Sequence, residues 1–356
     1  LQTWVLLLSI LTFLLSIVGT FLVRSGILTS VHAFANDSSR GIFLLLIFFV
    51  ITGFSFMLFI IKSPKNNKSV QILLINKITA IIVNNIIMIT ACFTILLGTI
   101  YPIIIESLIN QRISVGAPYF NSTVLPIMLP GFLLMSIAPI LSWQSNRIKK
   151  TKNYLVAFIF LIILIVIFSL FTTFNPWAII GIFLGLWIIT ASMIAIFINY
   201  KVSLSFKFIK NINSFIAHIG VGILILGITV SSIYKIEKNY EIAKEETFKI
   251  SDINIYFKDV VLKDKKNYQE LRGIFSIDNH NKIKIIEAGK NYYFVSKTIT
   301  TEAGILHTWF RDIYIVLGDQ NDKLWNIKVY INPLVNFIWL GVFIMIISGI
   351  VGVIKK

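Results

Sequence analysis

The sequence contains a single cysteine, Cys92, among its 356 residues. One cysteine excludes an intrachain disulfide and a metal cluster held by several cysteine ligands. It also excludes the CxxCH motif that attaches haem covalently, so the chain is not itself a c-type cytochrome. Histidine is nearly as rare, with four residues. Any imidazole chemistry must therefore come from four positions.

Charged side chains are scarce as well. They make up 13% of the chain, whereas hydrophobic residues make up 56% and the mean hydropathy is +0.84. A soluble domain could not bury so much apolar surface, so the composition predicts a mainly α-helical, polytopic membrane protein. Runs of about 20 apolar residues, the length that crosses the hydrocarbon core, recur along the chain. The predicted spans are 4–23, 41–61, 82–105, 122–143, 154–173, 177–198, 215–234 and 334–354.

Acidic residues are almost absent from the predicted membrane part. Of 16 acidic residues, 14 lie in 235–332, and the other two are Asp37 and Glu106. Of the 16 basic residues outside that segment, 13 fall in one alternating set of loops and three in the other. The positive-inside rule therefore places both termini inside, and the loop after the first span and segment 235–332 outside. The net charge of +16 follows from this topology and does not indicate nucleic-acid binding.

The segment 235–332 has the pattern of a β domain. Residues 253–262 and 282–295 are rich in β-branched and aromatic residues, and 312–331 reads as two strands around the turn GDQND. We therefore predict one external β-rich domain between the last two helices. The predicted domains are a seven-helix membrane region (1–234), the external β-rich domain (235–332) and a C-terminal transmembrane helix (333–356).

His218 is the histidine that lies within a predicted span, about one turn from the inner end. Ionisable residues inside membranes are costly and usually functional. Its neighbours Gly220, Gly222 and Gly227 offer small surface that could admit another helix. The same surface could leave room for a flat macrocycle. His218 is therefore either a ligand or an imidazole bonded to a neighbouring helix, and both interpretations stay open.

The other histidines lie outside the spans. His280, in the polar stretch DNHNK, is expected to be a solvated turn residue. His307 lies in an apolar loop with Trp309 and could touch a ligand or partner, although packing or membrane contact is the commoner role. His32 follows the first span by about nine residues, where an interfacial loop histidine is the simplest interpretation.

The predicted topology separates His32 from His218. His32 is outside and His218 is near the inner face, across a hydrocarbon core about 30 Å thick. Two axial ligands of one iron lie only about 4 Å apart. If both histidines bind iron, they therefore belong to two different sites, and each site needs a further ligand from elsewhere.

Several separated motifs resemble the CcmF family, the haem lyase subunit of the bacterial and plant-mitochondrial cytochrome c maturation system. The motifs are GTFLVRSGILTSVHAFA (19–35), LLGTIYPIIIESL (96–108), ISVGAPYFN (113–121), LPIMLPGFLLM (125–135), IAHIGVGILILGI (216–228), WFRDIYIVLGD (309–319) and NPLVNFIWLGVFIMIISG (332–349). Their order and spacing extend the resemblance through the whole chain.

The resemblance implies a role for each site residue. His32 matches an external axial ligand of the haem that the chaperone CcmE delivers, and His218 matches a membrane ligand of a resident haem b. Arg24 is a hypothetical partner of a haem propionate, or alternatively of lipid phosphate. The family's second external and second membrane histidines, and its tryptophan-rich WWD loop, have no counterpart here. The chain thus resembles a C-terminal half, either truncated or a separate subunit, and we expect it to be inactive without the N-terminal half.

The implied reaction attaches haem to the CxxCH motif of apocytochrome c through thioethers, with the resident haem as the reductant. The implied partners are CcmE, a CcmH-type subunit, apocytochrome c, the N-terminal half and the lipid bilayer. We expect the CcmH or apocytochrome contact near Ile305–Asp312. The expected location is the bacterial inner membrane, with the mitochondrial inner membrane as the other possibility.

Two alternatives come from other classes of protein. Eight spans, helix-breaking prolines and a membrane histidine would suit a polytopic transporter. The prolines concerned are Pro102, Pro126, Pro130 and Pro139. No paired acidic residues lie in the spans, which argues against a transporter. The second alternative is a non-catalytic structural membrane subunit.

Overall fold

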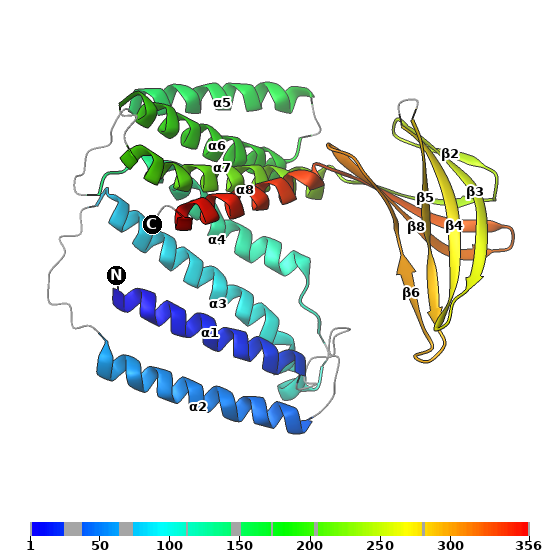
Figure 1. Cartoon of the computed structure of the whole chain (residues 1–356), viewed down its shortest axis with the longest axis horizontal. Coiled ribbons are helices and arrows are strands. Elements are labelled where there is room, and N and C mark those ends of the chain that lie inside the picture. The colour runs from blue at the N-terminus through cyan, green and yellow to red at the C-terminus, as the bar shows by residue number, and fades with distance from the viewer. Residues whose placement is uncertain are drawn as a thin grey trace. The chain divides into compact units, whose positions relative to one another are not determined.

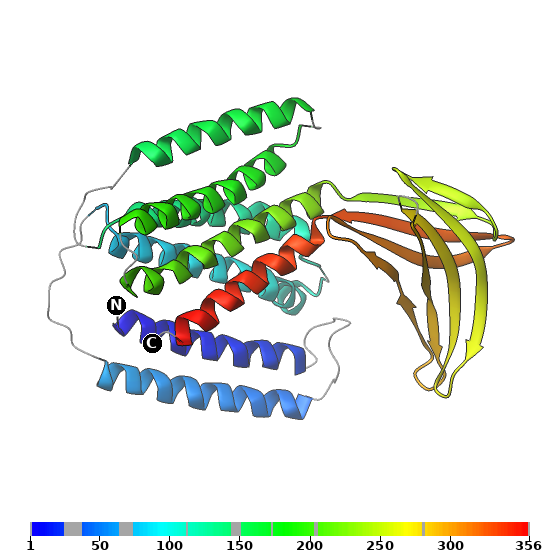
Figure 2. The same ribbon diagram turned by 45° about the horizontal axis from the view of Figure 1, so that its top comes forward.

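The computed structural model of the chain describes residues 2–24, 38–63, 74–111, 113–143, 151–171, 174–202, 206–279 and 282–354. Within these ranges it contains eight long helices and nine strands, which Figure 1 and Figure 2 show in order. The helices are α1 (Gln2–Arg24), α2 (Ser38–Lys62), α3 (Lys77–Ile109), α4 (Ala117–Ile137), α5 (Thr151–Phe171), α6 (Pro176–Val202), α7 (Phe206–Ile233) and α8 (Val335–Ile354). All eight are long and apolar enough to cross a membrane, which confirms the predicted multi-pass membrane protein.

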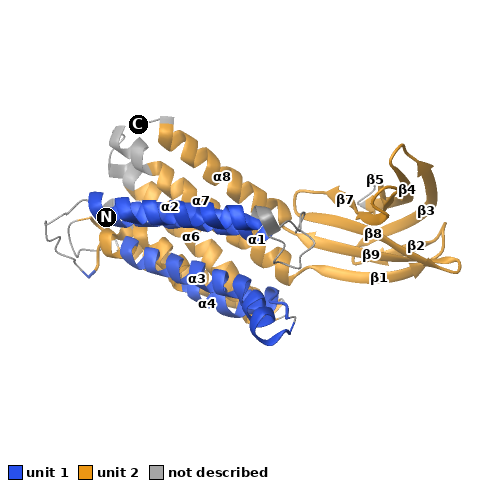
Figure 3. Cartoon of the chain, turned by 90° about the horizontal axis from the view of Figure 1, so that it is seen from below, with its two compact units in different colours: residues 1–74, 81–129 blue, residues 75–80, 130–356 orange. Residues whose placement is uncertain are grey.

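The chain divides into two compact units, coloured separately in Figure 3. The first comprises residues 1–74 and 81–129, and the second comprises residues 75–80 and 130–356. In the first unit α1 packs beside α2, and α4 packs on α3. The α3–α4 contact depends on Gly98, because a Cβ there would lie 2.3 Å from the Tyr119 ring. The Tyr119 hydroxyl donates to the carbonyl of Thr94 at 3.2 Å.

Three of the four prolines that would suit the transporter alternative lie inside continuous helices. Pro102 lies inside α3, Pro126 and Pro130 lie inside α4, and only Pro139 falls in a short 3-10 helix, Ala138–Ile140. In the turn before Pro126, the Thr123 hydroxyl donates to the carbonyl of Tyr119 at 2.7 Å. Proline is tolerated inside membrane helices, where neighbouring groups and local adjustments compensate for its missing N–H.

The start of α4 is earlier than the predicted span 122–143. Pro118 is the second residue of α4, where its missing N–H would have no helical partner in any case. The helix therefore begins at Ala117, five residues before the predicted span, and includes Asn121, which the hydropathy pattern left outside the span. Pro139 then converts the last turn into the 3-10 helix, so α4 also ends before residue 143.

Glycines bring α6, α7 and α8 into close contact in the second unit, where Figure 2 shows α7 and α8 side by side. A Cβ on Gly220 of α7 would lie 2.7 Å from the carbonyl oxygen of Gly341 in α8. On the α6 side, a Cβ on Gly222 would lie 2.7 Å from the carbonyl oxygen of Gly185. The Ser348 hydroxyl of α8 also donates to the carbonyl of Asn213 in α7. The sequence thus specifies a three-helix contact through small residues.

Between α7 and α8 the chain forms two antiparallel sheets, which confirms the predicted β-rich domain between the last two helices. One sheet has the order β1-β9-β8-β7 and the other β2-β3-β4-β5-β6. The strands are β1 (Ile236–Ile242), β2 (Thr247–Ile250), β3 (Ile253–Asp264), β4 (Tyr268–Asn279), β5 (Lys282–Tyr293), β6 (Thr298–Glu302), β7 (Gly304–His307), β8 (Arg311–Asn321) and β9 (Leu324–Pro333). The predicted strands at 253–262 and 282–295 and the hairpin at 312–331 are confirmed.

Alternation of side chains builds the core between these sheets. In β3, Ile253, Ile255 and Phe257 are buried while the intervening residues are exposed. Phe257 stacks on Phe275 of β4 with ring centroids 4.9 Å apart. The facing sheet contributes a second set of fully buried side chains, Ile313, Ile315, Leu317, Ile327 and Val329. This contiguous apolar core stabilises the sandwich by removing apolar surface from water.

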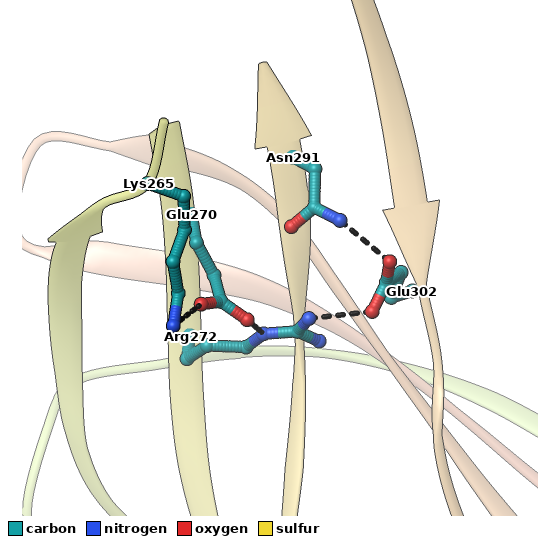
Figure 4. A network of polar contacts seen from close by, with 5 residues as sticks. All are labelled: Lys265, Glu270, Arg272, Asn291 and Glu302. Atoms are coloured by element: carbon teal, nitrogen blue, oxygen red, sulfur yellow. Dashed lines mark hydrogen bonds and ion pairs between the residues drawn. The ribbon is translucent and has the colours of Figure 1, made fainter. Parts of the chain in front are cut away.

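The outer face of the five-stranded sheet carries a polar network, shown in Figure 4. Arg272 of β4 donates to Glu270 on the same strand and to Glu302 of β6, each at 2.5 Å. Asn291 of β5 donates to the other oxygen of Glu302, also at 2.5 Å. Hydrogen bonding to Arg272 lowers the pKa of Glu270 below its usual value. The network holds the short edge strand β6 against β5.

Candidate functional site

His218 lies within the part of α7 that is apolar enough to cross a membrane, Ile212–Ile233. By the rise of an α-helix, the 15 residues from His218 to Ile233 place it about 22 Å from the sandwich end of α7. Its Nδ1 atom is buried and has no hydrogen-bond partner among the described residues. A buried polar atom without a hydrogen-bond partner lowers the stability of the fold, and such atoms often have a functional role.

The glycines near His218 are already filled by neighbouring helices. Gly220 faces Gly341 and Met345 of α8, whereas Gly222 faces Gly185 and Ile189 of α6. The suggestion that these glycines leave room for a flat macrocycle is therefore wrong for the faces they occupy. Their role is to fix α7 between α6 and α8, which holds the backbone of His218 in place.

The orphaned nitrogen of His218 is chemically compatible with a haem iron, because an imidazole nitrogen is a common axial ligand. The other expected function, an imidazole bonded to a neighbouring helix, is not seen at Nδ1. Within the described ranges the one other histidine is His307, which lies in the sandwich. The described part of the chain thus places one imidazole at the α7 site and no second one.

Of His32 and Arg24, the two residues predicted for an external haem site, the structure describes only Arg24. It is the last residue of α1, its side chain is exposed, and it makes no ion pair with any residue of the described ranges. A cation in the last helical turn is favoured by the helix dipole, which accounts for its position without a ligand. His32 and His280 lie outside the described residues, so the structure brings none of the predicted site residues together.

His307 is the last residue of β7 and not a loop residue as expected from the sequence. Its Nδ1 lies 2.9 Å from Oδ2 of Asp312, its partner in the β7–β8 register. The His307 side chain is 68% exposed, whereas that of Asp312 is 9% exposed. The sequence reasoning missed Asp312. The signal was present in HTWFRD, because a short hairpin loop places the first and last residues of this stretch opposite one another.

The hairpin loop that follows His307 rests on the start of α8. The amide of Leu334 donates to the carbonyl of Phe310 at 2.7 Å, and the Asn336 side chain donates to the carbonyl of Thr308 at 2.5 Å. Leu334 adopts a positive φ of 55°, which turns the chain from β9 into the helix. These contacts fix the sandwich to the membrane helix at a defined joint.

Arg311 anchors the same loop to the other sheet. Its guanidinium donates two hydrogen bonds to Asp252, at 2.7 and 2.9 Å. This bidentate pair lowers the pKa of Asp252 to about 2. The Arg311 backbone also exchanges hydrogen bonds with the Thr308 hydroxyl across the hairpin loop. Arg311 therefore connects the hairpin loop to the facing sheet.

An open groove of about 680 Å³ lies where the hairpin loop meets α8. Polar residues line the end near the sandwich, and apolar and aromatic residues line the remainder. The lining residues are His307, Thr308, Trp309, Asn336, Trp339, Leu340, Val342, Phe343 and Ile346. Trp309 and Trp339 are 78% and 69% exposed, so both indoles are available to contact a bound molecule.

Eight apolar helices with a β-sandwich between the last two define a multi-pass membrane protein with one extramembrane domain. Residues 233–333 match the family described as "CcmF C-terminal beta-sandwich". The cytochrome c-type biogenesis protein CcmF of Pseudomonas fluorescens is 30% identical over 365 residues, which cover 100% of this chain and 55% of that protein. CcmF of Escherichia coli K12 is 30% identical over 363 residues, which cover 98% of this chain and 55% of that protein.

A solved structure named "Cytochrome c Heme Lyase CcmF" has the same fold. It superposes with a TM-score of 0.77 at 17% identity and covers 99% of this chain and 54% of that chain. The chain therefore spans about half the length of the relatives it matches. It resembles the C-terminal half of CcmF, as the sequence motifs predicted.

Proposed function

We propose that this chain is the C-terminal part of a cytochrome c haem lyase. The observation that carries the proposal is the similarity to CcmF, which extends through all eight helices and the sandwich. The imidazole of His218, whose Nδ1 is buried and unpartnered in the described residues, supports it because a resident haem needs such a ligand.

In the proposed reaction, haem is the substrate and the chain positions it. Each of two thiols of a CxxCH motif adds to a haem vinyl group, forming one C–S and one C–H bond without net oxidation. His32 would hold the substrate iron through a neutral imidazole, which fixes the position of the vinyl groups. Arg24, at the end of α1, would pair with a propionate.

His218 would hold a resident haem b in the membrane. When bound, that group would supply an electron to keep the substrate iron ferrous. The chain's contribution is a half-buried imidazole, with its Nδ1 buried, on a helix fixed by glycine contacts to α6 and α8. The second ligands of both sites, including those of the N-terminal half, would come from outside the described residues.

The proposed partners follow from the similarity to CcmF. They are the haem chaperone CcmE, a CcmH-type subunit, apocytochrome c and the N-terminal half of CcmF. The proposed location is the bacterial inner membrane, or the mitochondrial inner membrane. The transporter alternative is weakened, since Pro102, Pro126 and Pro130 lie within continuous helices rather than at helix breaks.

An absorption spectrum tests the proposal. The chain is purified together with the polypeptide that supplies the remaining half of its relatives, as wild type, His218→Ala, His32→Ala and the control His280→Ala. We expect His218→Ala to lose the b-type bands, and His32→Ala to keep them but accept no haem from CcmE. Unchanged bands in His218→Ala would contradict the resident haem. Absence of haem in every form would favour the transporter or the structural subunit.

A further inference from the structure

The hydrogen bond between His307 and Asp312 leaves one imidazole nitrogen available for a ligand. In a neutral imidazole, the Nδ1–H would donate to the Asp312 carboxylate 2.9 Å away and Nε2 would keep its lone pair. A carboxylate behind a histidine is the arrangement that orients metal-binding imidazoles and raises their basicity. Asp312 is nearly fully buried and belongs to β8, so it is a rigid support.

The groove beside His307 suits a large, flat and mostly apolar molecule. Its volume of about 680 Å³ lies within the range of about 300–1,000 Å³ typical of small-molecule sites. Trp309, Trp339 and Phe343 supply exposed aromatic faces. We propose that this groove is a haem-binding site, with His307 as an axial ligand and Asp312 as its positioning residue.

The His307 site offers one imidazole, so it suits a metal whose other ligands come with the bound molecule. A bare zinc ion needs three or four protein ligands, and no cluster of three or more His, Cys, Asp or Glu occurs in the described residues. An iron porphyrin supplies four nitrogens itself and requires from the protein only an axial ligand and an apolar surface. The number of ligands and the shape of the groove therefore agree.

A phospholipid is the other amphiphile that could lie against α8. None of the nine described lining residues is lysine or arginine, so a phosphate and the haem propionates alike would have to lie in water at the open side of the groove. The nearby Arg311 is already held by Asp252 in a bidentate pair, and His307 is held by Asp312. The polar end of the groove thus offers a ligand for a metal rather than a counter-charge for phosphate.

The His307 site is separate from the site at His218. His307 belongs to the sandwich, whereas His218 lies about 22 Å along α7 from the sandwich end. The two imidazoles therefore cannot share one iron. The choice of haem rests on the proposed function, but the geometry of His307 does not depend on a resident haem at His218.

Titration with ferric haem, followed by difference absorption spectra, tests the site. The full chain in lipid nanodiscs carries His218→Ala and His32→Ala throughout, which removes both histidines that the proposed function assigns to haem. We expect haem to bind with an imidazole-ligated Soret band. His307→Ala and His307→Gln should each weaken binding about tenfold or more and abolish that band. Glutamine can still hydrogen-bond to Asp312, so its variant separates loss of the ligand from loss of folding.

Three comparisons complete the test. Free imidazole should restore the band in His307→Ala, which a purely structural role of His307 would not allow. His280→Ala should titrate as the parent does. Asp312→Asn should keep binding but alter the spectrum. Equal titration of the His307 variants and their parent would overturn the proposal, as would a bound phospholipid that haem does not displace. If the b-type bands were unchanged in His218→Ala while the His307 results were as expected, only the resident haem would be contradicted.

Discussion

Single glycines decide how closely the membrane helices of the second unit pack. Gly341 in α8 is the sharpest example, because a Cβ there would lie 2.6 Å from the carbonyl oxygen of Gly220 and 2.7 Å from the amide nitrogen of Leu224. Both are backbone atoms, which cannot move aside as a flexible side chain can. We therefore expect Gly341→Val to destabilise the protein by about 1–3 kcal/mol.

The same helix offers a matched control for this prediction. Gly349 has no atom within 4 Å of the position that a Cβ would occupy. Gly349→Val should therefore leave the thermal unfolding temperature of the purified protein almost unchanged, while Gly341→Val should lower it. Equal effects of the two substitutions would show that helix propensity, and not the close contact with α7, determines the result.

The ion pair between Asp252 and Arg311 should make the sandwich sensitive to acid. Because the pKa of Asp252 in the folded protein is about 2, below its ordinary value of 3.8, the pair stabilises the fold at neutral pH. This contribution is lost as the pH falls from about 4 to 2. The Asp252 side chain is 47% exposed, so the contribution at neutral pH should be at most about 1 kcal/mol.

Denaturant unfolding followed by tryptophan fluorescence measures this contribution. Asp252→Asn should lower stability at pH 7, and the difference from wild type should disappear near pH 2. Asp278→Asn is the control, since Asp278 is exposed on β4 and makes no ion pair with a described residue. A pH-independent effect of Asp252→Asn would mean that the carboxylate charge is not what stabilises the loop.

The joint between the β7–β8 hairpin and α8 includes Thr308 and Asn336, which both line the candidate haem groove. Asn336 donates to the carbonyl of Thr308, and the amide of Leu334 donates to Phe310. Asn336→Ala removes the first bond and should loosen the second. Hydrogen exchange of the segment 304–311 and of the Leu334 amide should become faster.

Asn254→Ala on the exposed face of β3 provides the comparison for the joint. It removes an asparagine of the same sandwich that lies far along the chain from α8. Exchange at 304–311 should then stay as in the wild type. If Asn336→Ala left that exchange unchanged as well, the hairpin would be held by the Leu334 bond and apolar packing alone.

The elements with a clear pattern could be predicted from the sequence, and the others could not. The β8–β9 hairpin alternates apolar and polar residues around a turn, so its position was evident. The strand β1 is an edge strand with mostly exposed side chains, and its pairing with β9 supplies what its own pattern lacks. The continuity of α4 through two prolines likewise depends on its surroundings rather than on propensity.

The candidate sites show the same division. His218 stood out because an ionisable residue inside an apolar span is rare. The filling of Gly220 and Gly222 by α8 and α6 could not be read from one helix, since both contacts are tertiary. Asp312 required the register of β7 and β8, which pairs it with His307. Single-residue chemistry was thus visible in the sequence, whereas partners across elements were not.

For the whole molecule, the unequal distribution of charge carries the prediction of topology. The segment 235–332 has 16 basic and 14 acidic residues, a difference of only two, and a domain of this length contributes little to orientation. The short loops decide instead, with 13 basic residues in one set and three in the other. The sandwich is therefore predicted to lie on the outer side, together with the end of α1.

Labelling with a membrane-impermeant maleimide tests this orientation. Cys92→Ser first removes the native thiol, and a single cysteine is then placed at Asp322, in the β8–β9 turn, or at Lys152, at the start of α5. In cells whose inner membrane is intact but accessible from outside, Asp322→Cys should be labelled at once. Lys152→Cys should react only after the membrane is permeabilised. Labelling of Lys152→Cys alone before permeabilisation would invert the topology, and it would remove both His32 and the His307 groove from the side on which haem attachment is proposed.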